Sequence, residues 1–255
     1  MLSKEQLRVL APSVFDVGPV DTVSEKYSFV STNNLIDVFS SVGWQCEKAK
    51  QVKSKLAHRK HHLTFTNPAM ATFKDPRDLG MDGGNFTLEL FNSSDGKFAF
   101  RLYLGIFTFI CENGLVLGSS FYSCRIPHLG ISEEDIKNTV LNLTSGIEHL
   151  QPLVTEMSQT TMNNDDAERF ASIAYKLRYP KADVINIDIH KNLLKPNREK
   201  DKGSDLWTRY NVVQENLMRG GFRNQRNRAV RAINSIAQTE RINTELWKLA
   251  EDYMD

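Results

Sequence analysis

Residues 86–123 read FTLELFNSSDGKFAFRLYLGIFTFICENGLVLGSSFYS, and this stretch decides the fold. It is apolar and rich in β-branched and aromatic residues, and two dipeptides interrupt it, Asp95-Gly96 and Asn113-Gly114. Asp-Gly and Asn-Gly supply the positive φ angles that tight hairpin turns require. The stretch therefore predicts three antiparallel strands in a meander, over residues 86–91, 97–110 and 115–123.

The middle strand indicates which face of this sheet is buried. Its apolar and polar positions alternate, with Phe98, Phe100, Leu102 and Leu104 set against Lys97, Ala99, Arg101 and Tyr103. A period of two is typical of a strand with one face in the core. We therefore expect the opposite face, which carries Arg101 and Tyr103, to be free to bind a ligand.

The residues before the meander predict an arm, a helix and two strands. The arm, residues 1–26, begins with a helix over 4–10 and then passes through two proline-containing breaks, which disfavour a continued helix. Residues 27–30 and 61–66 have the composition of strands. Between them, Ser31 begins a polar run that is typical of a helix N-cap.

The residues after the meander predict helices. Ser132 and the three acidic residues after it mark a helix start, because a hydroxyl cap and early negative charge both stabilise a helix N-terminus. Apolar residues then recur at steps of four and three up to Met157, and Pro152 is expected to kink or divide this helix. Further helices are predicted over 165–178, with Ile173 inward, and over 205–218 and 243–253; the short segment 184–189 is compatible with a strand.

Together these elements predict an α+β protein. An antiparallel β-meander with a β-β-β-α core packs against helices, and a helical region follows at the C-terminal end. We expect an N-terminal arm over residues 1–26, an α+β core with the antiparallel sheet over 27–160, and a helical region over 161–255 packed on or beside the core.

The composition is that of a globular protein. The 255 residues are 40% hydrophobic and 25% charged, with a formal net charge of +1, which argues against extensive disorder. Three cysteines without a CxxC spacing are typical of a reducing compartment. No apolar run reaches the length of a membrane span, and no signal peptide is recognised. We expect a cytoplasmic protein that does not insert into a membrane.

The sequence motifs of several common enzyme classes are absent. There is no GxxxxGK[ST] loop, GxGxxG turn, HExxH helix or GxSxG elbow. We therefore predict no catalytic residue, no cofactor and no metal site. One alternative stays open, a metal-dependent enzyme that uses His61, His62, Glu112 and His128. Histidines beside Arg59 and Lys60 fit a cationic surface better, because neighbouring positive charge disfavours a metal ion.

Two stretches without any acidic residue carry the clearest functional signal. One runs from Lys48 to Lys74, and the other lies between Glu215 and Glu240. Cations that neutralise phosphates, together with aromatic rings that stack unpaired bases, are typical of proteins that bind single strands. The predicted nucleic-acid-binding residues are Lys48, Lys50, Lys53, Lys55, Arg59, Lys60, Arg101, Tyr103, Tyr122, Arg125, Arg219, Arg223, Arg226, Arg228 and Arg231.

Several short motifs resemble one family, the phage/plasmid-like domain of unknown function found in bacteriophages, plasmids and prophages. They include Asn92-Ser93-Ser94-Asp95-Gly96, Phe109-Ile110-Cys111-Glu112-Asn113-Gly114-Leu115, Arg125-Ile126-Pro127-His128-Leu129-Gly130 and Tyr210-Asn211-Val212-Val213-Gln214-Glu215-Asn216-Leu217. The resemblance covers residues 27–254. One departure is Ser94, which stands where the family usually has histidine.

The resemblance implies a mobile-element protein in the cytoplasm of a bacterial host. The order of strands and helix is also similar to the core of phage single-strand annealing proteins of the Red-beta and RecT kind, which form rings or filaments with DNA along a basic groove. We therefore expect an oligomeric protein that binds single-stranded DNA or RNA and acts in annealing or recombination. A counter-defence protein that contacts a host protein, anchored by Arg219 and Trp247, is the first alternative, and the metal-dependent enzyme is the second.

Overall fold

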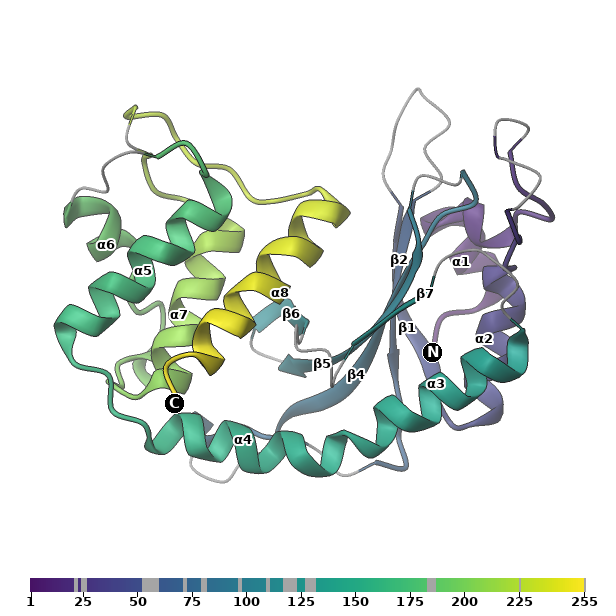
Figure 1. Cartoon of the computed structure of the whole chain (residues 1–255), viewed down its shortest axis with the longest axis horizontal. Coiled ribbons are helices and arrows are strands. Elements are labelled where there is room, and N and C mark those ends of the chain that lie inside the picture. Colours follow the sequence, from purple (N-terminus) through teal and green to yellow (C-terminus); the bar gives the residue numbers. More distant parts are fainter. Residues whose placement is uncertain are drawn as a thin grey trace. The chain divides into compact units, whose positions relative to one another are not determined.

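The computed structural model describes residues 1–20, 23, 27–51, 60–70, 73–78, 82–95, 98–108, 111–116, 123–126, 132–182, 187–224 and 226–254. These residues form an α+β protein with an antiparallel sheet and helices at the C-terminal end, as predicted (Figure 1). The chain divides into two compact units. Unit 1 comprises Met1–Thr72, Asn85–Ile106 and Ser120–Ile147, and unit 2 comprises Phe73–Gly84, Phe107–Ser119 and Glu148–Asp255.

The sheet of unit 1 contains two of the three strands that the apolar stretch predicts, β4 (Asp82–Asn92) and β5 (Phe100–Thr108). The strands of this sheet are β1 (Gln45–Gln51), β2 (His61–Thr66), β4, β5 and β7 (Ser123–Ile126). They follow the order β1-β2-β4-β5, and β7 pairs with β5. Leu63 lies opposite Leu90 and Leu102 opposite Cys124, so apolar side chains of neighbouring strands meet in the core.

The helices of unit 1 begin at hydroxyl caps. They are α1 (Lys4–Leu10), the 3-10 helix η1 (Pro12–Phe15), α2 (Thr32–Ser41) and α3 (Glu133–Ser145). The side chains of Ser3, Ser31 and Ser132 each accept a backbone N–H from the first turn of α1, α2 and α3, respectively. The predicted positions of α1, α2 and the start of α3 are therefore confirmed.

Three local predictions in the sheet are wrong. Residues 27–30 form no strand; they lead directly into the cap of α2, and the Tyr27 hydroxyl donates to the Ser93 carbonyl oxygen at 3.0 Å. The Asn113-Gly114 turn is instead part of strand β6 (Cys111–Val116), and the strand expected over 115–123 is replaced by β6 and β7. A turn dipeptide ends a strand only if pairing with the neighbouring strand also ends there. Here β6 continues through Asn113-Gly114.

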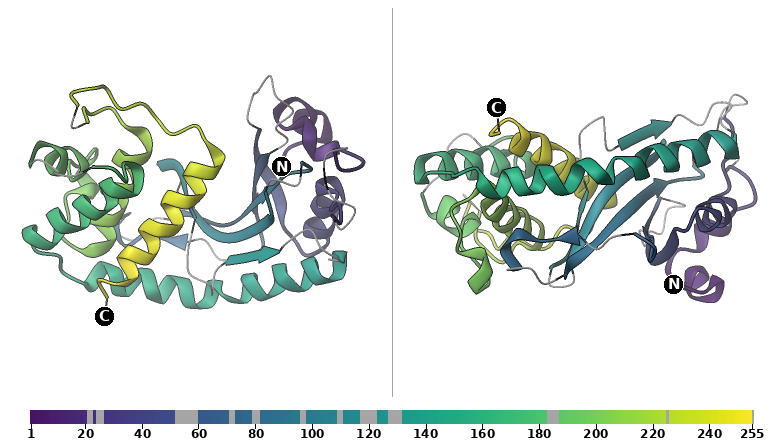
Figure 2. Two further views of the ribbon diagram at one scale, coloured as in Figure 1. Left: turned by 45° about the horizontal axis from the view of Figure 1, so that its top comes forward. Right: turned by 90° about the horizontal axis from the view of Figure 1, so that it is seen from below.

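Unit 2 is mainly helical. Its helices are α4 (Ile147–Gln159, from Glu148 on), α5 (Asn164–Arg178), α6 (Ile187–Leu193), α7 (Leu206–Arg219) and α8 (Ile236–Glu251), with the 3-10 helices η2 (Pro76–Asp78) and η3 (Glu199–Asp201) and strands β3 (Phe73–Lys74) and β6. Helices α5, α7 and α8 pack against one another (Figures 1 and 2). The Tyr210 ring lies between two tryptophan rings, with centroid distances of 6.0 Å to Trp207 and 5.7 Å to Trp247.

The helices of unit 2 correct several expected boundaries. The segment compatible with a strand is helical from Ile187, and α8 begins at Ile236 rather than at Asn243. Helix α4 continues through Pro152, whereas the break in the helical stripe falls at Gly146. Proline has no N–H to donate to the carbonyl oxygen four residues earlier in the helix. Because this part of α4 is exposed, that carbonyl oxygen can accept a hydrogen bond from water instead. Ile173 is 38% exposed, because α5 turns the face with Ala174 and Tyr175 inward instead.

No helix in the described part of the chain combines the length and the apolar content needed to cross a lipid bilayer.

Candidate nucleic-acid interface

The described residues between α7 and α8, 220–224 and 226–235, form a loop that we call the arginine loop. It begins at Gly220, which has φ +74°, and a Cβ added there would lie 2.5 Å from the Val230 carbonyl oxygen. The Gly221 N–H donates to that same carbonyl at 2.9 Å, and the Val230 N–H donates to the Phe222 carbonyl at 2.8 Å. The loop therefore folds back over its own start, and only glycine fits where it does so.

One side chain organises the tip of the arginine loop. The Asn224 Oδ1 atom accepts the backbone N–H groups of Arg226 and Arg228, each at 3.0 Å. The Asn224 N–H donates to the Arg228 carbonyl at 3.0 Å, and Asn227 adopts φ +54° to close the turn. Because the backbone is held in this way, the side chains of Arg226 and Arg228 remain exposed.

Arg178, the last residue of α5, ties the loop to two helices. Its Nη1 donates to the Leu217 carbonyl oxygen in α7, and its Nη2 donates to the Arg231 carbonyl oxygen in the loop. Burial lowers the pKa of Arg178, and the neighbouring Tyr179 opposes that shift. Both terminal nitrogens are thus committed to carbonyl oxygens, and Arg178 positions the loop rather than serving as a free cation.

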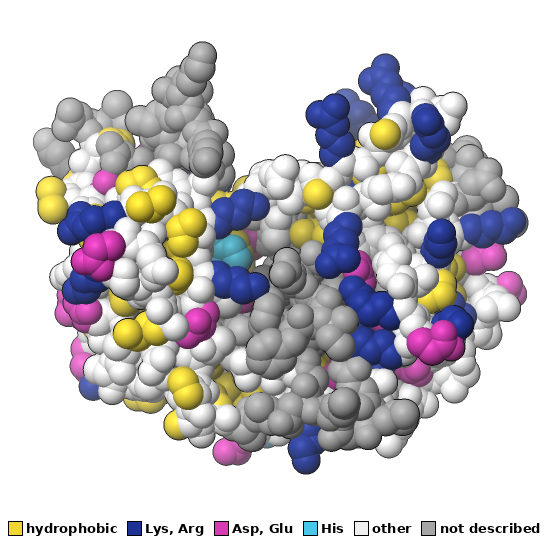
Figure 3. Space-filling model, turned by 180° about the vertical axis from the view of Figure 1, so that it is seen from behind, with side chains coloured by type: hydrophobic (Ala, Val, Ile, Leu, Met, Phe, Trp, Pro, Cys, Tyr) yellow, Lys and Arg dark blue, Asp and Glu magenta, His cyan; other side chains and the backbone are white. Residues whose placement is uncertain are grey.

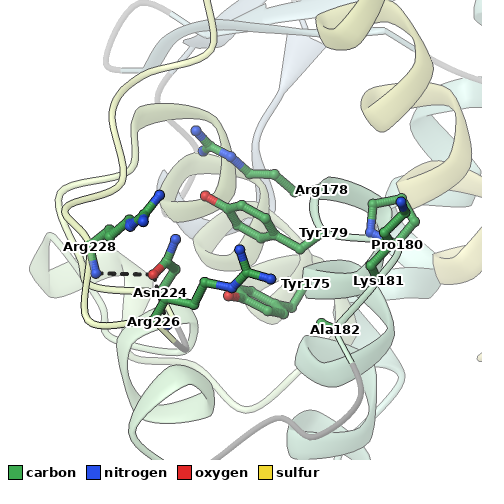
Figure 4. A pocket seen from close by; sticks show the side chains of 9 residues that line it. All are labelled: Tyr175, Arg178, Tyr179, Pro180, Lys181, Ala182, Asn224, Arg226 and Arg228. Atoms are coloured by element: carbon green, nitrogen blue, oxygen red, sulfur yellow. Dashed lines mark hydrogen bonds between the residues drawn. The ribbon is translucent and has the colours of Figure 1, made fainter.

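A cavity of about 430 Å³ lies beside the arginine loop (Figure 4). Its lining residues are Tyr175, Arg178, Tyr179, Pro180, Lys181, Ala182, Asn224, Arg226 and Arg228. In Figure 4 the two tyrosine rings lie in the centre, Arg226 and Arg228 come from the loop on one side, and Lys181 lies on the other. The ring centroids of Tyr175 and Tyr179 are 4.8 Å apart. The described lining residues combine aromatic surface with positive charge, and none of them is a carboxylate.

Within the described part of the chain, Arg226, Arg228 and Lys181 lack the acidic partner that some arginines of unit 2 have. Arg219 pairs with Glu215 at 2.6 Å, and Arg241 pairs with Glu245 at 2.9 Å. Among the residues that the structure describes, no carboxylate forms an ion pair with Arg226, Arg228 or Lys181. In Figure 3 Lys and Arg side chains gather at the upper right, over the arginine loop, and no described Asp or Glu side chain lies among them. This surface can accept a polyanion without first breaking ion pairs.

Residues 19–247 match the sequence model of the family described as "Domain of unknown function (DUF932)". The chain belongs to this family. It is 27% identical to UPF0380 protein YfjQ of Escherichia coli (strain K12) and 26% identical to UPF0380 protein YafZ of the same strain. Each alignment covers 98% of this chain and 90% of the relative. No solved structure matches the chain.

The structure brings some of the predicted binding residues of this DUF932 protein together. Those in the arginine loop, Arg223, Arg226, Arg228 and Arg231, are all exposed. In unit 1, Lys60 Nζ and Arg101 Cζ lie 4.0 and 4.3 Å from the centroid of the Phe98 ring. Arg101 also lies opposite Arg125 in the β5–β7 pair. Each unit thus has its own group of predicted cations.

Other predicted residues lie elsewhere or are not described. Lys48 and Lys50 are exposed on β1, and Arg219 is neutralised by Glu215. Tyr103 is not free to stack a base: its side chain is 7% exposed, and its ring packs edge-on against Phe91 at 5.7 Å. Both faces of β5 are covered here, so the expectation of an open face is wrong for Tyr103. Lys53, Lys55, Arg59 and Tyr122 lie outside the described residues.

Of the nine residues that line the cavity in this DUF932 protein, only Arg226 and Arg228 were predicted from the sequence. Tyr175, Arg178, Tyr179 and Lys181 were not predicted, although Tyr175 and Tyr179 have the i, i+4 spacing of one helix face followed by a proline and a lysine. That pattern could have indicated an aromatic and basic patch at the end of a helix. The pattern could not have indicated that the arginine loop lies beside this patch.

The histidines of the alternative metal site are separated and already bonded. The ring nitrogens of His61 lie 2.9 Å from the hydroxyls of Ser13 and Thr32, whereas His62 Nε2 lies 2.6 Å from Glu89 Oε2. Successive residues of β2 point to opposite faces of the sheet, so His61 and His62 do not converge. In the described ranges, no three His, Cys, Asp or Glu side chains form a group that could hold a metal ion. His128 and the Glu112 side chain fall outside them.

A chain of charges, buried or half-buried except at its Arg219 end, also lies in unit 2. Asp75, Arg77, Asp201, Arg198, Glu215 and Arg219 alternate in sign, with contacts between 2.5 and 3.2 Å along the chain. Trp207 Nε1 donates to Asp75 Oδ1 at 2.9 Å. Burial would raise the pKa of Asp75, but the hydrogen bonds and charge of Arg77, together with the Trp207 bond, outweigh it and lower the pKa. Every carboxylate is neutralised, so this chain joins η2, η3 and α7 rather than binding a ligand.

Trp247, which was expected to anchor a contact with a host protein, is buried. Trp247 is 0% exposed and packs against Tyr210, with its Nε1 donating to Glu251 Oε1 at 2.7 Å. It is therefore part of the core of unit 2 and cannot reach a partner surface. The prediction that Trp247 anchors a contact with a host protein is wrong.

Proposed function

We propose that this DUF932 protein binds single-stranded nucleic acid through the arginine loop and the cavity beside it. The observation that carries the proposal is the pair Arg226 and Arg228, exposed and without a carboxylate partner among the described residues, at the edge of a cavity lined by two tyrosines. Phosphate-neutralising cations beside aromatic rings are the two parts of a surface that binds single strands with little sequence preference.

The proposed mechanism assigns a different task to each kind of side chain. Lys181, Arg226 and Arg228 neutralise phosphates and release their counterions, which provides affinity that falls with salt. Tyr179 supplies a ring for stacking, a contact that contributes about 1–3 kcal/mol per base in other proteins. A strand held by its phosphates keeps most base edges accessible to a second strand. On this proposal the protein acts in annealing or recombination.

The test is a titration of a fluorescent oligothymidine with the protein at several salt concentrations, followed by fluorescence anisotropy. We expect binding whose logarithm falls linearly with the logarithm of salt concentration. In the double variant Arg226→Ala/Arg228→Ala, two phosphate contacts are lost, and the slope should become shallower by about 1.4 because each contact on a single strand contributes about 0.7.

A matched control is Arg169→Ala. Arg169 is an exposed arginine of α5 in the same unit, and it does not line the cavity. Its removal changes the net charge but not the proposed site, so the slope should change little. If the wild-type protein shows no affinity, or if both substitutions change the slope equally, the arginine loop is not a specific binding surface.

A further inference from the structure

We infer that the cavity beside the arginine loop is a site for a single nucleotide, which holds both the phosphate and the base of a nucleoside 5′-phosphate. The nucleotide is either free or the terminal unit of a strand that carries a 5′-phosphate. This inference deepens the proposed function and rests on it, but it makes a separate claim: that the site recognises one nucleotide as a unit rather than a length of charged backbone.

The size of the cavity fits a small ligand. Its volume of about 430 Å³ lies within the range of about 300–1,000 Å³ that is typical of small-molecule sites. A base with its sugar and phosphate is a ligand of that class, whereas several consecutive nucleotides are not.

The arginines of the loop form the phosphate end of the site. Arg226 and Arg228 approach from the loop, whereas Lys181 lies on the other side of the tyrosine rings (Figure 4). Guanidinium groups bind phosphate oxygens in a bidentate manner. Arg178 is excluded from this task, since it donates to the carbonyl oxygens of Leu217 and Arg231. It keeps the two walls of the cavity at a fixed separation.

The base has an aromatic wall. The rings of Tyr175 and Tyr179 are tilted by 36° with centroids 4.8 Å apart, so they form a continuous apolar surface. Tyr175 is 1% exposed and closes the bottom of this wall, while Tyr179 is only half-buried and can meet a base. A binding site for inorganic phosphate or another small anion would have no use for such a surface.

Asn224 adds a polar group with a fixed direction. Its Oδ1 accepts two backbone N–H groups at 3.0 Å, which determines where its Nδ2 points. In Figure 4 that nitrogen is directed toward Tyr179. An amide nitrogen only donates hydrogen bonds, so it matches a carbonyl oxygen of a base or an oxygen of the sugar. The aromatic wall, the amide donor and the two loop arginines therefore match the base, the sugar and the phosphate of one nucleotide.

The experiment measures the binding of dTMP, thymidine and inorganic phosphate by isothermal titration calorimetry at low salt. We expect dTMP to bind with one site per chain and at least about tenfold more tightly than either of the other two, since stacking contributes about 1–3 kcal/mol. Tyr179→Ala should remove the advantage of dTMP over phosphate. Arg226→Ala/Arg228→Ala should remove its advantage over thymidine, and Arg169→Ala should change neither.

A parallel titration separates this inference from the proposed function. Oligothymidine with and without a 5′-phosphate is compared, and we expect the phosphorylated strand to bind several-fold more tightly. If oligonucleotides bind in an arginine-dependent way but dTMP binds no better than phosphate, the single-nucleotide site is wrong and the proposed function stands. If dTMP binds and oligonucleotides do not, the site is correct and the proposed function is wrong. If neither dTMP nor oligonucleotides bind, both the single-nucleotide site and the proposed function are wrong.

Discussion

At the scale of single residues, the geometry of the arginine loop depends on bonds to its backbone rather than on the exposed arginines themselves. Arg178 bonds two carbonyl oxygens that belong to different elements, and Asn224 bonds two backbone N–H groups of the loop. Gly220 permits the close return of the chain. The exposed arginines therefore take their positions from neighbours with structural tasks, and these neighbours can be tested through stability alone.

Arg178→Ala should lower the free energy of unfolding by about 2 kcal/mol. The substitution leaves the carbonyl oxygens of Leu217 and Arg231 without their donor. One of these bonds is part-buried and the other is exposed, so the pair is expected to contribute near the lower end of the about 1.5–3 kcal/mol typical of a bond from a charged group. Urea unfolding followed by circular dichroism measures the change. Lys176→Ala, an exposed change two residues earlier in α5, should stay within about 0.5 kcal/mol of wild type. If the two variants were equally stable, the hydrogen bonds from Arg178 to Leu217 and Arg231 would not stabilise the fold.

Gly220→Ala should destabilise the protein more than Gly221→Ala does. Both residues have positive φ, +74° and +86°, so each substitution meets backbone strain of about 1–2 kcal/mol. Only at Gly220 does the new Cβ also approach backbone, at 2.5 Å from the Val230 carbonyl oxygen, whereas nothing lies within 4 Å at Gly221. The pair is compared by thermal unfolding, and a lower midpoint for the Gly221 variant would rule out the close return of the loop.

At the scale of elements, the buried chain of charges connects η2, η3 and α7 and has a clear pH signature. The pKa of Asp75 is lowered in the folded protein, so its carboxylate stabilises the fold at pH values above its ordinary pKa. As pH falls through the lowered value, the group protonates in the folded state as well and that stabilisation is lost. The stability of unit 2 should therefore decrease on the acid side of about pH 4.

Asp75→Asn tests this account. The variant keeps the shape but leaves Arg77 without its main partner, so at pH 7 it should lose about 3–5 kcal/mol, as happens when one member of a buried ion pair is removed. Its deficit relative to wild type should shrink as pH falls below about 4, where the wild-type carboxylate also loses its charge. Urea unfolding at a series of pH values measures both the loss of stability at pH 7 and its change with pH. A deficit that does not change with pH would exclude the carboxylate as its source.

The elements also show what sequence patterns can predict. Helix starts with hydroxyl caps and the strand at residues 61–66 were predicted because their signals are local. Strand β1, with the sequence QCEKAKQ, was not predicted, since only its pairing with β2 makes so polar a segment a strand. Asn113-Gly114 was misread for the same reason. Patterns within a segment predict elements, whereas pairing partners decide the exceptions.

The candidate site, like the secondary structure, was predictable only where its signal lies within one segment of the sequence. The arginines between residues 223 and 231 stood out because no acid lies near them in the sequence. Tyr175, Arg178 and Lys181 belong to a segment more than forty residues earlier and join them only through the packing of α5 against α7. Charge along the chain indicated one wall of the cavity, and the fold supplied the other.

At the scale of the whole molecule, each of the two units carries predicted cations of its own. If oligomers form on a strand, as proposed for an annealing protein, the particle mass should rise in steps of one chain when oligothymidine is added. Size-exclusion chromatography with light scattering measures this. We expect the step to vanish with Arg226→Ala/Arg228→Ala and to persist with Lys202→Ala, an exposed lysine paired with Glu199. A mass that never exceeds one chain plus one strand would remove oligomerisation from the proposal.

The exposed tip of the arginine loop also makes it a natural cutting point for trypsin, which cleaves after arginine and lysine. Four arginines fall between residues 223 and 231, and helix α8 beyond them remains anchored by Leu246 and Trp247 in the interior. A short digestion should therefore give a nicked chain whose two fragments stay together until a denaturant separates them. A ligand seated at the loop would shield these peptide bonds, so the rate of nicking reports occupancy without any label.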